Sequence, residues 1–485
     1  MATKPTEHIL LFSVDAWGHI GPLCGLAARI IQIQQIHVTF LATPVYVDKI
    51  KKEISRHITK GNEDLQSLVR VIGLELSHEF TNMAEVWKGF KAFGDAYEQL
   101  VKEQPLVCSV TQTRFDALPA PRSIILDMFC ADPIKNVRDR SGNSVKLYLW
   151  HPACASFLLP LAAPKAFGGR GDWRPQVHAE VLRSGKDIKV VAEEILFKPR
   201  GEIFRIAGLP PIYDYELQPQ DMPVEEPLIG SLWMSLLDGL DLCDGIILNT
   251  SEEFERTPIS SIRKWFKQDE KTVYTVGFRN STVHEFDPEI SRQRVFIIHL
   301  LWILLLNIPF IMSHGSPWAV VPDEVKAKVE KYGQGILSPW SPQQAILAHP
   351  VTGWFVSHGG QNSTLEAITS GVPMILWPYH ADQPLNAIHL TENFDAGYEL
   401  IEVRTSHGLK PRCRTGTAPI GTIEAVRTEA TQVLTDAFGA GGARKRANMK
   451  TLHRRVIAGW DDNGVSKVDL DKFVRALVAP SSVVE

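Results

Sequence analysis

The sequence predicts an α/β protein with two Rossmann-like halves that face each other across a cleft. Three observations lead to this class. Short apolar runs alternate with longer amphipathic runs, the pattern of a parallel sheet covered by helices on both faces. The alternation occurs once before about residue 250 and again after residue 308. The length of 485 residues also suits two or three domains better than one.

In the first half, buried strands are expected where short apolar runs end at turn-forming residues. These runs are Ile9–Val14, Val38–Ala42, Leu68–Ile72, Ser123–Asp127, Val145–Trp150 and Gly245–Leu248. Helical spacing predicts helices at Pro22–Gln34 and at the aromatic-rich Met83–Lys102. The proline-rich interval Lys198–Pro227 predicts a long surface loop. The charged residues from Glu252 to about Asn280 predict an irregular connection between the halves.

The second half repeats the alternation of strands and helices. Strands are expected at Pro309–Ser313, Gly335–Ser338, Thr352–Val356 and Met374–Leu376. Helices are expected at Gly421–Asp436, Gly442–Ala458 and Val468–Leu477. The basic cluster Arg444-Lys445-Arg446 is expected on a solvated helix face.

Composition excludes several classes of protein. A net charge of −4 gives no electrostatic reason to expect nucleic acid or an anionic membrane as the main partner. The six cysteines form no CxxC pair, so we expect neither a disulfide framework nor a zinc site, and we predict a reducing, cytoplasmic location. No signal-peptide layout precedes the first strand. Val295–Met312 is almost wholly apolar but contains His299, Asn307 and Pro309, so a buried helix running into a buried strand is expected rather than a transmembrane span.

A possible anion site follows the strand expected at Thr352–Val356. The next residues are Ser-His-Gly-Gly-Gln-Asn-Ser, from Ser357 to Ser363, and an amphipathic helix begins there. Glycines let the backbone come close to a ligand, and a helix N-terminus offers free N–H groups and a partial positive charge. His358, Asn362 and Glu366 follow at intervals of four and share one face if helical geometry starts early. This arrangement suits a diphosphate followed by a ribose.

Taken whole, the stretch from Trp340 to Gln383 resembles the UDP-sugar signature box of plant-type family 1 glycosyltransferases, and it matches that box in length. Gly359 stands where the plant pattern has Cys, and Gln361 stands where it has Trp; the glutamine is familiar in fungal-like relatives. The resemblance covers roughly residues 5 to 275 and 308 to 480. It implies a GT-B fold and transfer of a hexosyl group from a UDP-sugar, with inversion, to a hydroxyl of a small acceptor.

The resemblance also implies a role for each matching position. Trp340 would stack on the uracil, and Gln343 would lie close to the nucleoside. The diphosphate would be held by His358, Gly360, Asn362 and Ser363, and the ribose hydroxyls by Glu366. Asp382 and Gln383 would bind the sugar, and the terminal glutamine implies glucose. UDP-glucose is thus the expected donor substrate, no other cofactor is implied, and no metal is expected because no Asp-x-Asp motif lies near the box.

An inverting transfer needs a base, and the family uses a histidine just after the first strand. His19 occupies that place, before an expected proline-started helix. A carboxylate on the other ring nitrogen would fix the tautomer and stabilise the imidazolium. Asp127, at the end of the strand SIILD, matches the family's aspartate, and Asp15 is a rival because it is close in sequence. An unperturbed histidine titrates near 6.5 and can accept a proton around neutrality.

The resemblance fails between residues 276 and 307. Relatives open their second domain there with a strand and a short Ser/Phe/Gly-rich loop that contacts the donor phosphates, and no such loop is found here. A faulty gene model, an inactive copy and a true variant all remain open, so the alternative function is a catalytically impaired relative that binds UDP-sugar. The expected domains are 1–255 for the acceptor, 256–280 as a linker, 281–460 for the UDP-sugar, and 461–485 as a helix packing back on the first domain.

The acceptor is expected to be a small, apolar molecule with a hydroxyl group. A sterol, terpenoid, phenol or lipid would suit, and docking at a membrane surface to collect it stays open. Walls for the acceptor are expected from the aromatic helix around Trp87–Tyr97 and from the loop near Trp173.

Overall fold

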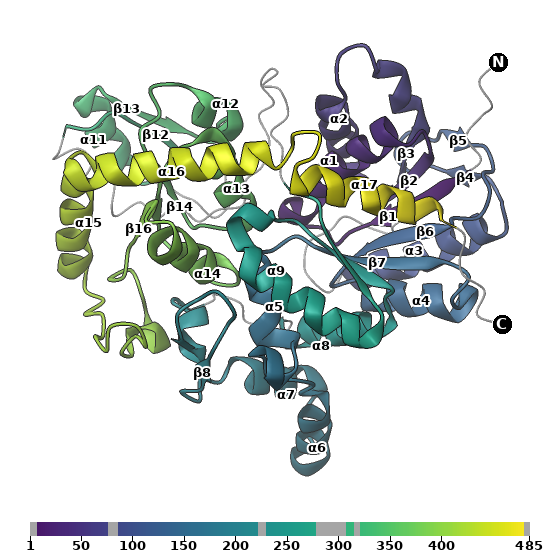
Figure 1. Cartoon of the computed structure of the whole chain (residues 1–485), viewed down its shortest axis with the longest axis horizontal. Coiled ribbons are helices and arrows are strands. Elements are labelled where there is room, and N and C mark those ends of the chain that lie inside the picture. The colour runs from purple at the N-terminus through teal and green to yellow at the C-terminus, as the bar shows by residue number, and fades with distance from the viewer. Residues whose placement is uncertain (1–6, 76–85, 222–228, 278–306, 315–320, 480–485) are drawn as a thin grey trace.

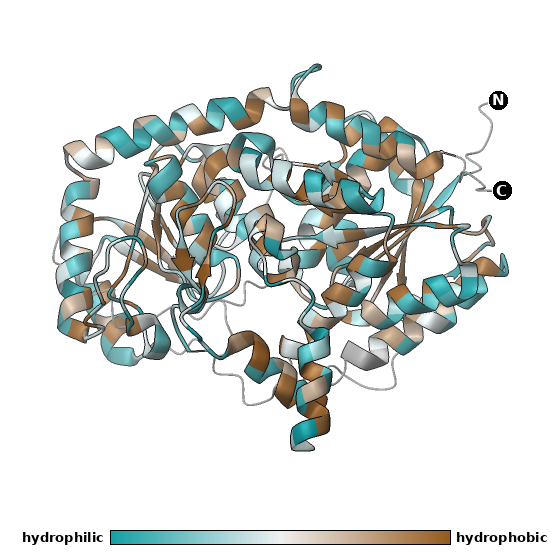
Figure 2. Ribbon diagram, turned by 60° about the horizontal axis from the view of Figure 1, so that its bottom comes forward, coloured by the Kyte–Doolittle hydropathy of each residue, from teal (hydrophilic) through white to brown (hydrophobic). Residues whose placement is uncertain are grey.

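The computed structural model describes residues 7–75, 86–221, 229–277, 307–314 and 321–479. These residues form two lobes that lie side by side (Figure 1). Apolar residues concentrate on the strands inside the lobes, and the helices that surround them carry polar residues outward (Figure 2). The predicted α/β class is confirmed.

The first lobe is built on a seven-stranded parallel sheet with the order β11-β10-β7-β6-β1-β2-β3. Its strands are β1 (His8–Phe12), β2 (His37–Ala42), β3 (Val69–Gly73), β6 (Ser123–Asp127), β7 (Lys146–His151), β10 (Gly245–Leu248) and β11 (Thr272–Thr275). Every residue of β1 is buried because helices cover both faces of the sheet. The chain adds strands outward from β1 in one direction and outward from β6 in the other, so the switch point of the sheet lies between these two strands.

Nine helices of this lobe surround the sheet in the described ranges: α1 (Trp17–Ile33), α2 (Val47–His57), α3 (Val86–Val101), α4 (Ala131–Ser141), α5 (Ala155–Ala162), α6 (Arg174–Ser184), α7 (Ile188–Phe197), α8 (Ile229–Leu242) and α9 (Glu252–Phe266). Two short antiparallel hairpins join them, β4 (Leu106–Val107) with β5 (Arg114–Phe115), and β8 (Ile203–Phe204) with β9 (Ile212–Tyr213).

Helix α1 begins five residues before the predicted start, so Pro22 lies inside it rather than at its beginning. Proline has no N–H to bond the carbonyl four residues earlier, which belongs to Gly18. That carbonyl oxygen instead accepts a hydrogen bond from Nδ2 of Asn362, in the other lobe, at 2.8 Å. A partner distant in sequence therefore makes the proline tolerable inside the helix.

The interval 198–227 is not the surface loop that its prolines predict. Its described part contains β8, β9 and a 3₁₀ turn at Asp214–Leu217, all four of whose residues are buried. The hydroxyl of Tyr215 donates to the carbonyl of Pro411, and Nε2 of Gln220 donates to the carbonyl of Pro378 at 2.8 Å. This segment is buried because it packs against the second lobe.

The prediction of an irregular connection after Glu252 is wrong where the structure describes it. Helix α9 extends to Phe266, and β11 then pairs in parallel with β10. The interval 256–277 thus contributes most of a helix and the edge strand of the first sheet. The predicted domain boundaries remain a prediction.

The second lobe contains two separate sheets in the described part of the chain. One pairs β12 (Phe310–Ser313) with β13 (Gly335–Ser338), and the other has the order β14-β15-β16, from Phe355–Ser357, Met374–Leu376 and Gly397–Glu399. Strand β16 was not predicted, and β14 begins three residues later than expected. Ile311, Ile336 and Val356, on three of these strands, are about half exposed.

The helices of the second lobe are α11 (Asp323–Tyr332), α12 (Gln343–Ala348), α13 (Gln361–Ser370), α14 (Gln383–Ile388), α15 (Ile423–Ala437) and α16 (Ala440–Ala458). The basic cluster in α16 is not simply a solvated face. Lys445 is buried, and it shares the carboxylate of Asp395 with Arg444. Arg446 donates to the carbonyl of Ala437 at 2.8 Å, which holds the end of α15 against α16.

After α16, the chain crosses back, and α17 (Val465–Val478) lies on the first lobe (Figure 1). Oδ2 of Asp469 accepts hydrogen bonds from the backbone N–H of Thr275 at 2.9 Å and from Arg263 at 2.8 Å. Ser123 donates to the carbonyl of Leu477 at 2.7 Å.

Of the helices described here, none is long and apolar enough to cross a bilayer. Residues 295–306 of the apolar segment, like all of 278–306 in the interval where the resemblance fails, lie outside the described residues.

Candidate active site

His19 and Asp127 meet at the switch point of the first sheet. Asp127 is the last residue of β6, and His19 lies in the first turn of α1, which follows β1. Nδ1 of His19 is 2.7 Å from Oδ2 of Asp127. The same oxygen accepts from the hydroxyl of Ser13 at 3.1 Å, and Oδ1 accepts from the backbone N–H of Phe129 at 3.0 Å. These bonds fix a fully buried carboxylate against one nitrogen of the imidazole.

The charge of Asp127 controls the protonation of His19. A carboxylate accepts hydrogen bonds, so the proton of the neutral ring lies on Nδ1 and the lone pair on Nε2. Burial works to lower the pKa of His19, but the carboxylate of Asp127, with help from Asp382, raises that pKa above 6.5. The side chain of His19 keeps 22% of its surface exposed, so its outer nitrogen can be reached.

The rival Asp15 takes another partner. Its Oδ1 accepts a hydrogen bond from the hydroxyl of Thr43 at 2.8 Å. The structure therefore brings Asp127, and not Asp15, onto the imidazole of His19. On the other side, Nε1 of Trp150 donates to the carbonyl of His19 at 3.0 Å, which anchors the backbone of this residue.

The turn after β14 depends on two glycines. Gly359 has a φ of +82°, a conformation that side chains rarely adopt, and a Cβ there would lie 2.6 Å from Leu376. A Cβ on Gly360 would lie 2.5 Å from Nε2 of His358, so the histidine ring packs directly over this residue. Glycine at 359, unusual for the plant pattern, therefore fits this backbone.

Helix α13 begins at Gln361, so His358 lies before the helix. The expectation that His358 shares a helix face with Asn362 and Glu366 is therefore wrong, and only the last two share one. Desolvation lowers the pKa of His358 to about 4, so its ring is neutral at neutral pH. It can meet an anion as a hydrogen-bond donor but not as a cation.

Gln343 and Glu366, expected at the nucleoside, and Ser363, expected at the diphosphate, come together at the start of α12 and on α13. Nε2 of Gln343 donates to Oε2 of Glu366 at 2.6 Å and approaches the hydroxyl of Ser363 at 3.4 Å. Gln344 donates to the other carboxylate oxygen of Glu366 at 3.1 Å. Burial raises the pKa of Glu366. Trp340 lies three residues before Gln343, in the turn between β13 and α12.

Asn362 and Asp382 reach across to the first lobe. Besides donating to Gly18, Asn362 accepts a hydrogen bond from Nδ2 of Asn249 at 3.1 Å. Oδ2 of Asp382 accepts from the backbone N–H of Gln361 at 3.1 Å and is 3.4 Å from the backbone nitrogen of Cys154. Burial raises the pKa of Asp382 to about 6. Two residues expected to bind the donor thus lie beside the His19 turn and α5.

Gln383 bonds residues close to it in the sequence, whereas Gln361 bonds a residue of the first lobe. Oε1 of Gln383 accepts from the backbone N–H groups of Tyr379 at 2.7 Å and His380 at 3.1 Å, which shapes the end of the signature box. Nε2 of Gln361 donates to the carbonyl of Asn249 at 2.8 Å. Gln361, one of the two residues that depart from the plant pattern, therefore forms a contact between the lobes.

A small cavity lined by residues of both lobes lies next to the end of the signature box. Its walls are mostly apolar, and its lining includes Phe157, Phe204, Trp233, Arg170 and His380. Trp233 contacts Phe129, whose ring centroid is 5.7 Å from that of His19. His19 does not line the cavity, and the rings of Phe129 and Trp233 lie one after the other between them.

The aromatic residues predicted to form walls for the acceptor are buried where the structure describes their side chains, and the prediction itself stays untested. Phe93 and Tyr97 of α3 are fully buried, and Phe93 packs on Phe12 of β1, so this aromatic face belongs to the core. The side chain of Trp87 lies outside the described residues. Trp173 is also buried, although Arg170, in the same loop, lines the cavity. The other lining residues come from α5, α7, α8, β8, residues 214–218 and the second-lobe pair His380 and Ala381, and no local sequence pattern marks them.

Among the residues that the structure covers, no cluster of three or more His, Cys, Asp or Glu side chains could hold a metal ion. All six cysteines are described, and each is a free thiol.

Comparison with known proteins gives a consistent result. The family described as UDP-glucoronosyl and UDP-glucosyl transferase matches residues 323–413. UDP-glycosyltransferase 72B1 of Arabidopsis thaliana is 38% identical, over 82% of this chain and 84% of its own length. UDP-glycosyltransferase eriJ of Hericium erinaceus is 28% identical, over 96% of this chain and 99% of its own length.

Solved structures show the same fold. UGT2 of Phytolacca americana, complexed with UDP-2fluoro-glucose and pterostilbene, superposes with a TM-score of 0.66 at 19% identity, covering 98% of this chain and 100% of its own. A transferase of Siraitia grosvenorii in complex with UDP gives a TM-score of 0.68 at 18% identity, again over 98% and 100%. Both are similar to this chain in the GT-B arrangement of two Rossmann-like lobes.

Proposed function

Because this chain belongs to the UDP-glycosyltransferase family, enzymes that transfer a sugar from a UDP-sugar, we propose that it moves glucose from UDP-glucose to a hydroxyl of a small, apolar acceptor, with inversion. The observation that carries the proposal is the 2.7 Å contact between His19 and Asp127 at the switch point, beside the signature box. The free thiols of all six cysteines support a reducing, cytoplasmic location as part of the same proposal.

His19 acts as the general base in this proposal. Its Nε2 takes the proton of the acceptor hydroxyl while the oxygen attacks the anomeric carbon of the sugar, and the bond from that carbon to UDP breaks. Asp127, on Nδ1, stabilises the imidazolium that forms. General-base catalysis of this kind typically contributes about 10²–10⁴-fold to the rate. The raised pKa of His19 strengthens the base, and it also means that the ring must lose its proton before each cycle.

The signature box holds the donor. Glu366, already positioned by Gln343 and Gln344, would accept hydrogen bonds from the ribose hydroxyls, and Trp340 would stack on the uracil. The neutral ring of His358 and the N-terminus of α13, with Gly360 and Ser363, would bind the diphosphate by hydrogen bonds.

Asp382 and Gln383 would complete the donor site on the sugar side, and Asn362 would add a contact to the diphosphate. All three side chains have hydrogen-bond partners within the protein, so a bound donor would replace some of these hydrogen bonds with its own. Gln383 at the end of the box supports glucose over other hexoses.

The proposal is tested with purified protein, UDP-glucose and a panel of hydroxylated apolar acceptors, with the products identified by mass spectrometry. UDP-galactose and UDP-glucuronate serve as alternative donors. Glucoside formation that His19→Ala abolishes, while UDP binding by calorimetry is retained, supports the proposal. Normal turnover by His19→Ala would overturn the mechanism, and a preference for another donor would overturn glucose.

One observation favours a second candidate, a relative that binds UDP-sugar but is catalytically impaired. Strands β12 and β14 are not joined in a single sheet by any described strand, and Ile311 and Val356 are about half exposed there. Saturable UDP-glucose binding that Glu366→Ala weakens, together with no transfer to any acceptor and no hydrolysis, would favour this candidate.

A further inference from the structure

Asn249 contacts the donor-site helix α13 from the opposite lobe. It follows β10, and its backbone is bonded on both sides. Its N–H donates to the carbonyl of His151 at 3.0 Å, and its own carbonyl accepts from Nε2 of Gln361 at 2.8 Å. Only 1% of Asn249 is exposed. The residue is therefore held in place between the first sheet and the start of α13.

The side chains of Asn249 and Asn362 form a hydrogen-bonded pair. Nδ2 of Asn249 lies 3.1 Å from Oδ1 of Asn362, and Nδ2 of Asn362 lies 2.8 Å from the carbonyl oxygen of Gly18. The two ends of a carboxamide have nearly the same shape, so their orientation has to be derived from neighbours that only donate or only accept. Gly18 is such a neighbour, because a carbonyl oxygen can only accept.

The orientation of the pair follows from Gly18. Its carbonyl requires the NH₂ end of Asn362, so the oxygen of Asn362 faces Asn249 and requires the NH₂ end of that residue. The carbonyl of Pro152, 3.4 Å from Nδ2 of Asn249, requires the same orientation. Gly18 is available because Pro22 has no N–H to bond it within α1. Acceptors on both sides of the pair thus fix one orientation of the Asn362 amide.

This orientation leaves Asn362 able to donate to a ligand. Its Nδ2 carries two N–H groups, and the bond to Gly18 uses one of them; the other has no partner in the described part of the chain. Asn362 is half-buried and lies in the first turn of α13, where free backbone N–H groups and the helix dipole favour an anion. A reversed amide would present its oxygen in place of this N–H and would repel an anion.

We propose that Asn249 is a positioning residue for the donor diphosphate, an inference that rests on the proposed function. From the first lobe, it holds the carboxamide of Asn362 so that the remaining N–H is presented to the diphosphate. Gln361 supports this role, because it fixes the backbone of Asn249. Asn249 acts through Asn362 and does not itself bind the donor. The diphosphate site is therefore complete only while the two lobes are in contact.

Binding of UDP and of uridine tests the inference without sugar transfer. Asn249→Leu keeps the size of the side chain but removes the group that donates to Asn362. By calorimetry on the full chain, this variant should weaken UDP binding by about 3- to 10-fold, the size expected for the loss of a hydrogen bond. Uridine, which has no phosphate and is measured by displacement with UDP, should keep its affinity. Equal losses for the two ligands would overturn the inference.

A double-mutant cycle separates positioning from a general effect on the protein. In the Asn362→Ala background, Asn249→Leu should not weaken UDP binding further, because the residue through which Asn249 acts has lost its amide. Losses that multiply in the double variant would show that Asn249 acts by another route and would overturn the inference.

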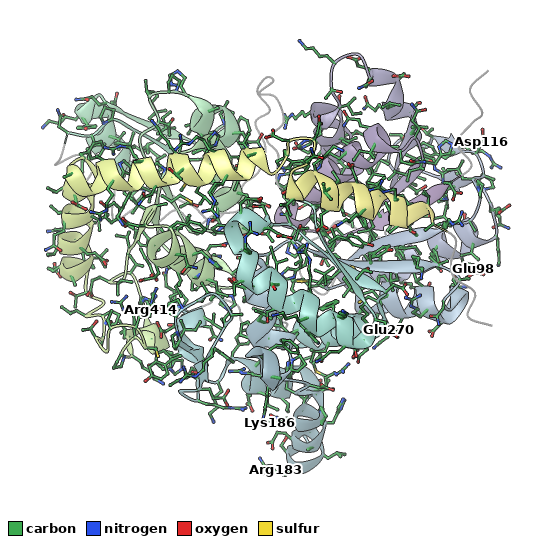
Figure 3. All side chains as sticks on the ribbon, viewed as in Figure 1. Glu98, Asp116, Arg183, Lys186, Glu270 and Arg414 are labelled. Carbon is green, nitrogen blue, oxygen red and sulfur yellow. The ribbon has the colours of Figure 1, made fainter. Side chains whose placement is uncertain are left out.

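Tyr215→Phe is the matched control for the contact between the lobes. It removes the hydrogen bond from the Tyr215 hydroxyl to the carbonyl of Pro411 but keeps the ring. Arg414, three residues after Pro411, lies low in the second lobe (Figure 3), well below α13 in the same view (Figure 1). This variant should lower the melting temperature, as Asn249→Leu does, but leave UDP affinity unchanged. An equal loss of UDP affinity in both variants would mean that any weaker contact between the lobes has this effect, and would overturn the inference.

Kinetics distinguish this inference from the proposed function. With UDP-glucose and an acceptor that the wild type glucosylates, Asn249→Leu should raise the KM for UDP-glucose as much as the Kd for UDP, and leave kcat nearly unchanged. No transfer by the wild type, with the effects on UDP binding intact, would reject the proposed function but not this inference. Transfer by the wild type, with undiminished UDP affinity in Asn249→Leu, would overturn the inference alone. A wild type that does not bind UDP would overturn both.

Discussion

Asn362 donates a hydrogen bond from Nδ2 to the carbonyl oxygen of Gly18, over 2.8 Å and between the two lobes. The bond joins the first turn of the donor-site helix α13 to the first turn of α1, which contains His19. The carbonyl is available because Pro22, four residues later, has no N–H to bond it. An amide expected to bind diphosphate thus also ties the donor site to the residue proposed as the base.

Asn362→Ala should weaken the contact between the lobes. It removes the bonds to Gly18 and Asn249, and their loss should lower the free energy of unfolding by about 1–2 kcal/mol. The melting temperature, followed by calorimetry, should fall for this variant and not for Asn62→Ala, whose side chain is exposed. A variant that melts like the wild type would show that the cross-lobe bond contributes nothing to stability.

Asp127→Asn should reduce kcat strongly while leaving UDP affinity unchanged. The amide fits the same space, but it does not stabilise the imidazolium of His19, so a loss of about 10²–10⁴-fold is expected. Asp15→Asn is the matched control, because Asp15 bonds Thr43 rather than His19, and it should keep most of the activity. A larger loss for Asp15→Asn than for Asp127→Asn would reverse the assignment.

The pH profile of transfer should reflect the raised pKa of His19. The base works only without its proton, so kcat/KM should rise with pH through that pKa, with the half-maximal point above 6.5. Asp127→Asn removes the charge that raises the pKa, and its residual activity should rise at lower pH than in the wild type. Initial rates from pH 5.5 to 9 measure both profiles, and an unshifted rising limb would contradict the electrostatic role of Asp127.

Asp382→Asn should stabilise the protein at neutral pH while impairing transfer. Burial raises the pKa of Asp382 to about 6, from an ordinary value near 3.8, so the folded state binds the proton more tightly than the unfolded chain. The stability from this group is complete below pH 3.8 and is lost as pH rises through 6. The gain from the neutral amide, about 3 kcal/mol at most, should be larger at pH 8 than at pH 5. Urea unfolding at the two pH values measures it, and an equal gain at both would refute the titration.

Gly360→Ala should weaken UDP binding. The added Cβ would lie 2.5 Å from Nε2 of His358 and would displace the ring from the turn that leads into α13. Gly353→Ala is the control, since a Cβ there meets nothing within 4 Å. UDP titration by calorimetry should show a loss of roughly 10-fold or more for Gly360→Ala alone, the size expected when one or two hydrogen bonds are lost. Equal affinity for both variants would mean that His358 does not contribute to the site.

The strands were predictable because their signals are local. Strands β6, β10, β13 and β15 have the bounds read from the sequence, since each is a short apolar run between turn-forming residues. The position of the turn after β14 followed from its two glycines, and the pairing of His19 with Asp127 from the resemblance.

The features that were missed depend on partners far away in sequence. The sequence pattern around Tyr215 predicts a loop, because its contact with Pro411 cannot be seen in the sequence. The pattern also predicts that α1 starts at Pro22, because the hydrogen bond from Asn362 to Gly18 cannot be seen there either. The cavity collects Arg170, Trp233 and His380 from three separate parts of the chain, and no period or motif connects them. Contacts between the lobes cannot be read from one sequence, because no local pattern encodes which surface will face which.

The return of the chain to the first lobe has a consequence for biosynthesis. Helix α17 packs against β11, and its Asp469 bonds the backbone of that strand, yet it leaves the ribosome after the whole second lobe. The first lobe therefore lacks its contacts with α17 until synthesis has passed Val478. It cannot complete its fold before the second lobe has been synthesised, and a chain that ends early would leave β11 without the hydrogen bond from its backbone to Asp469.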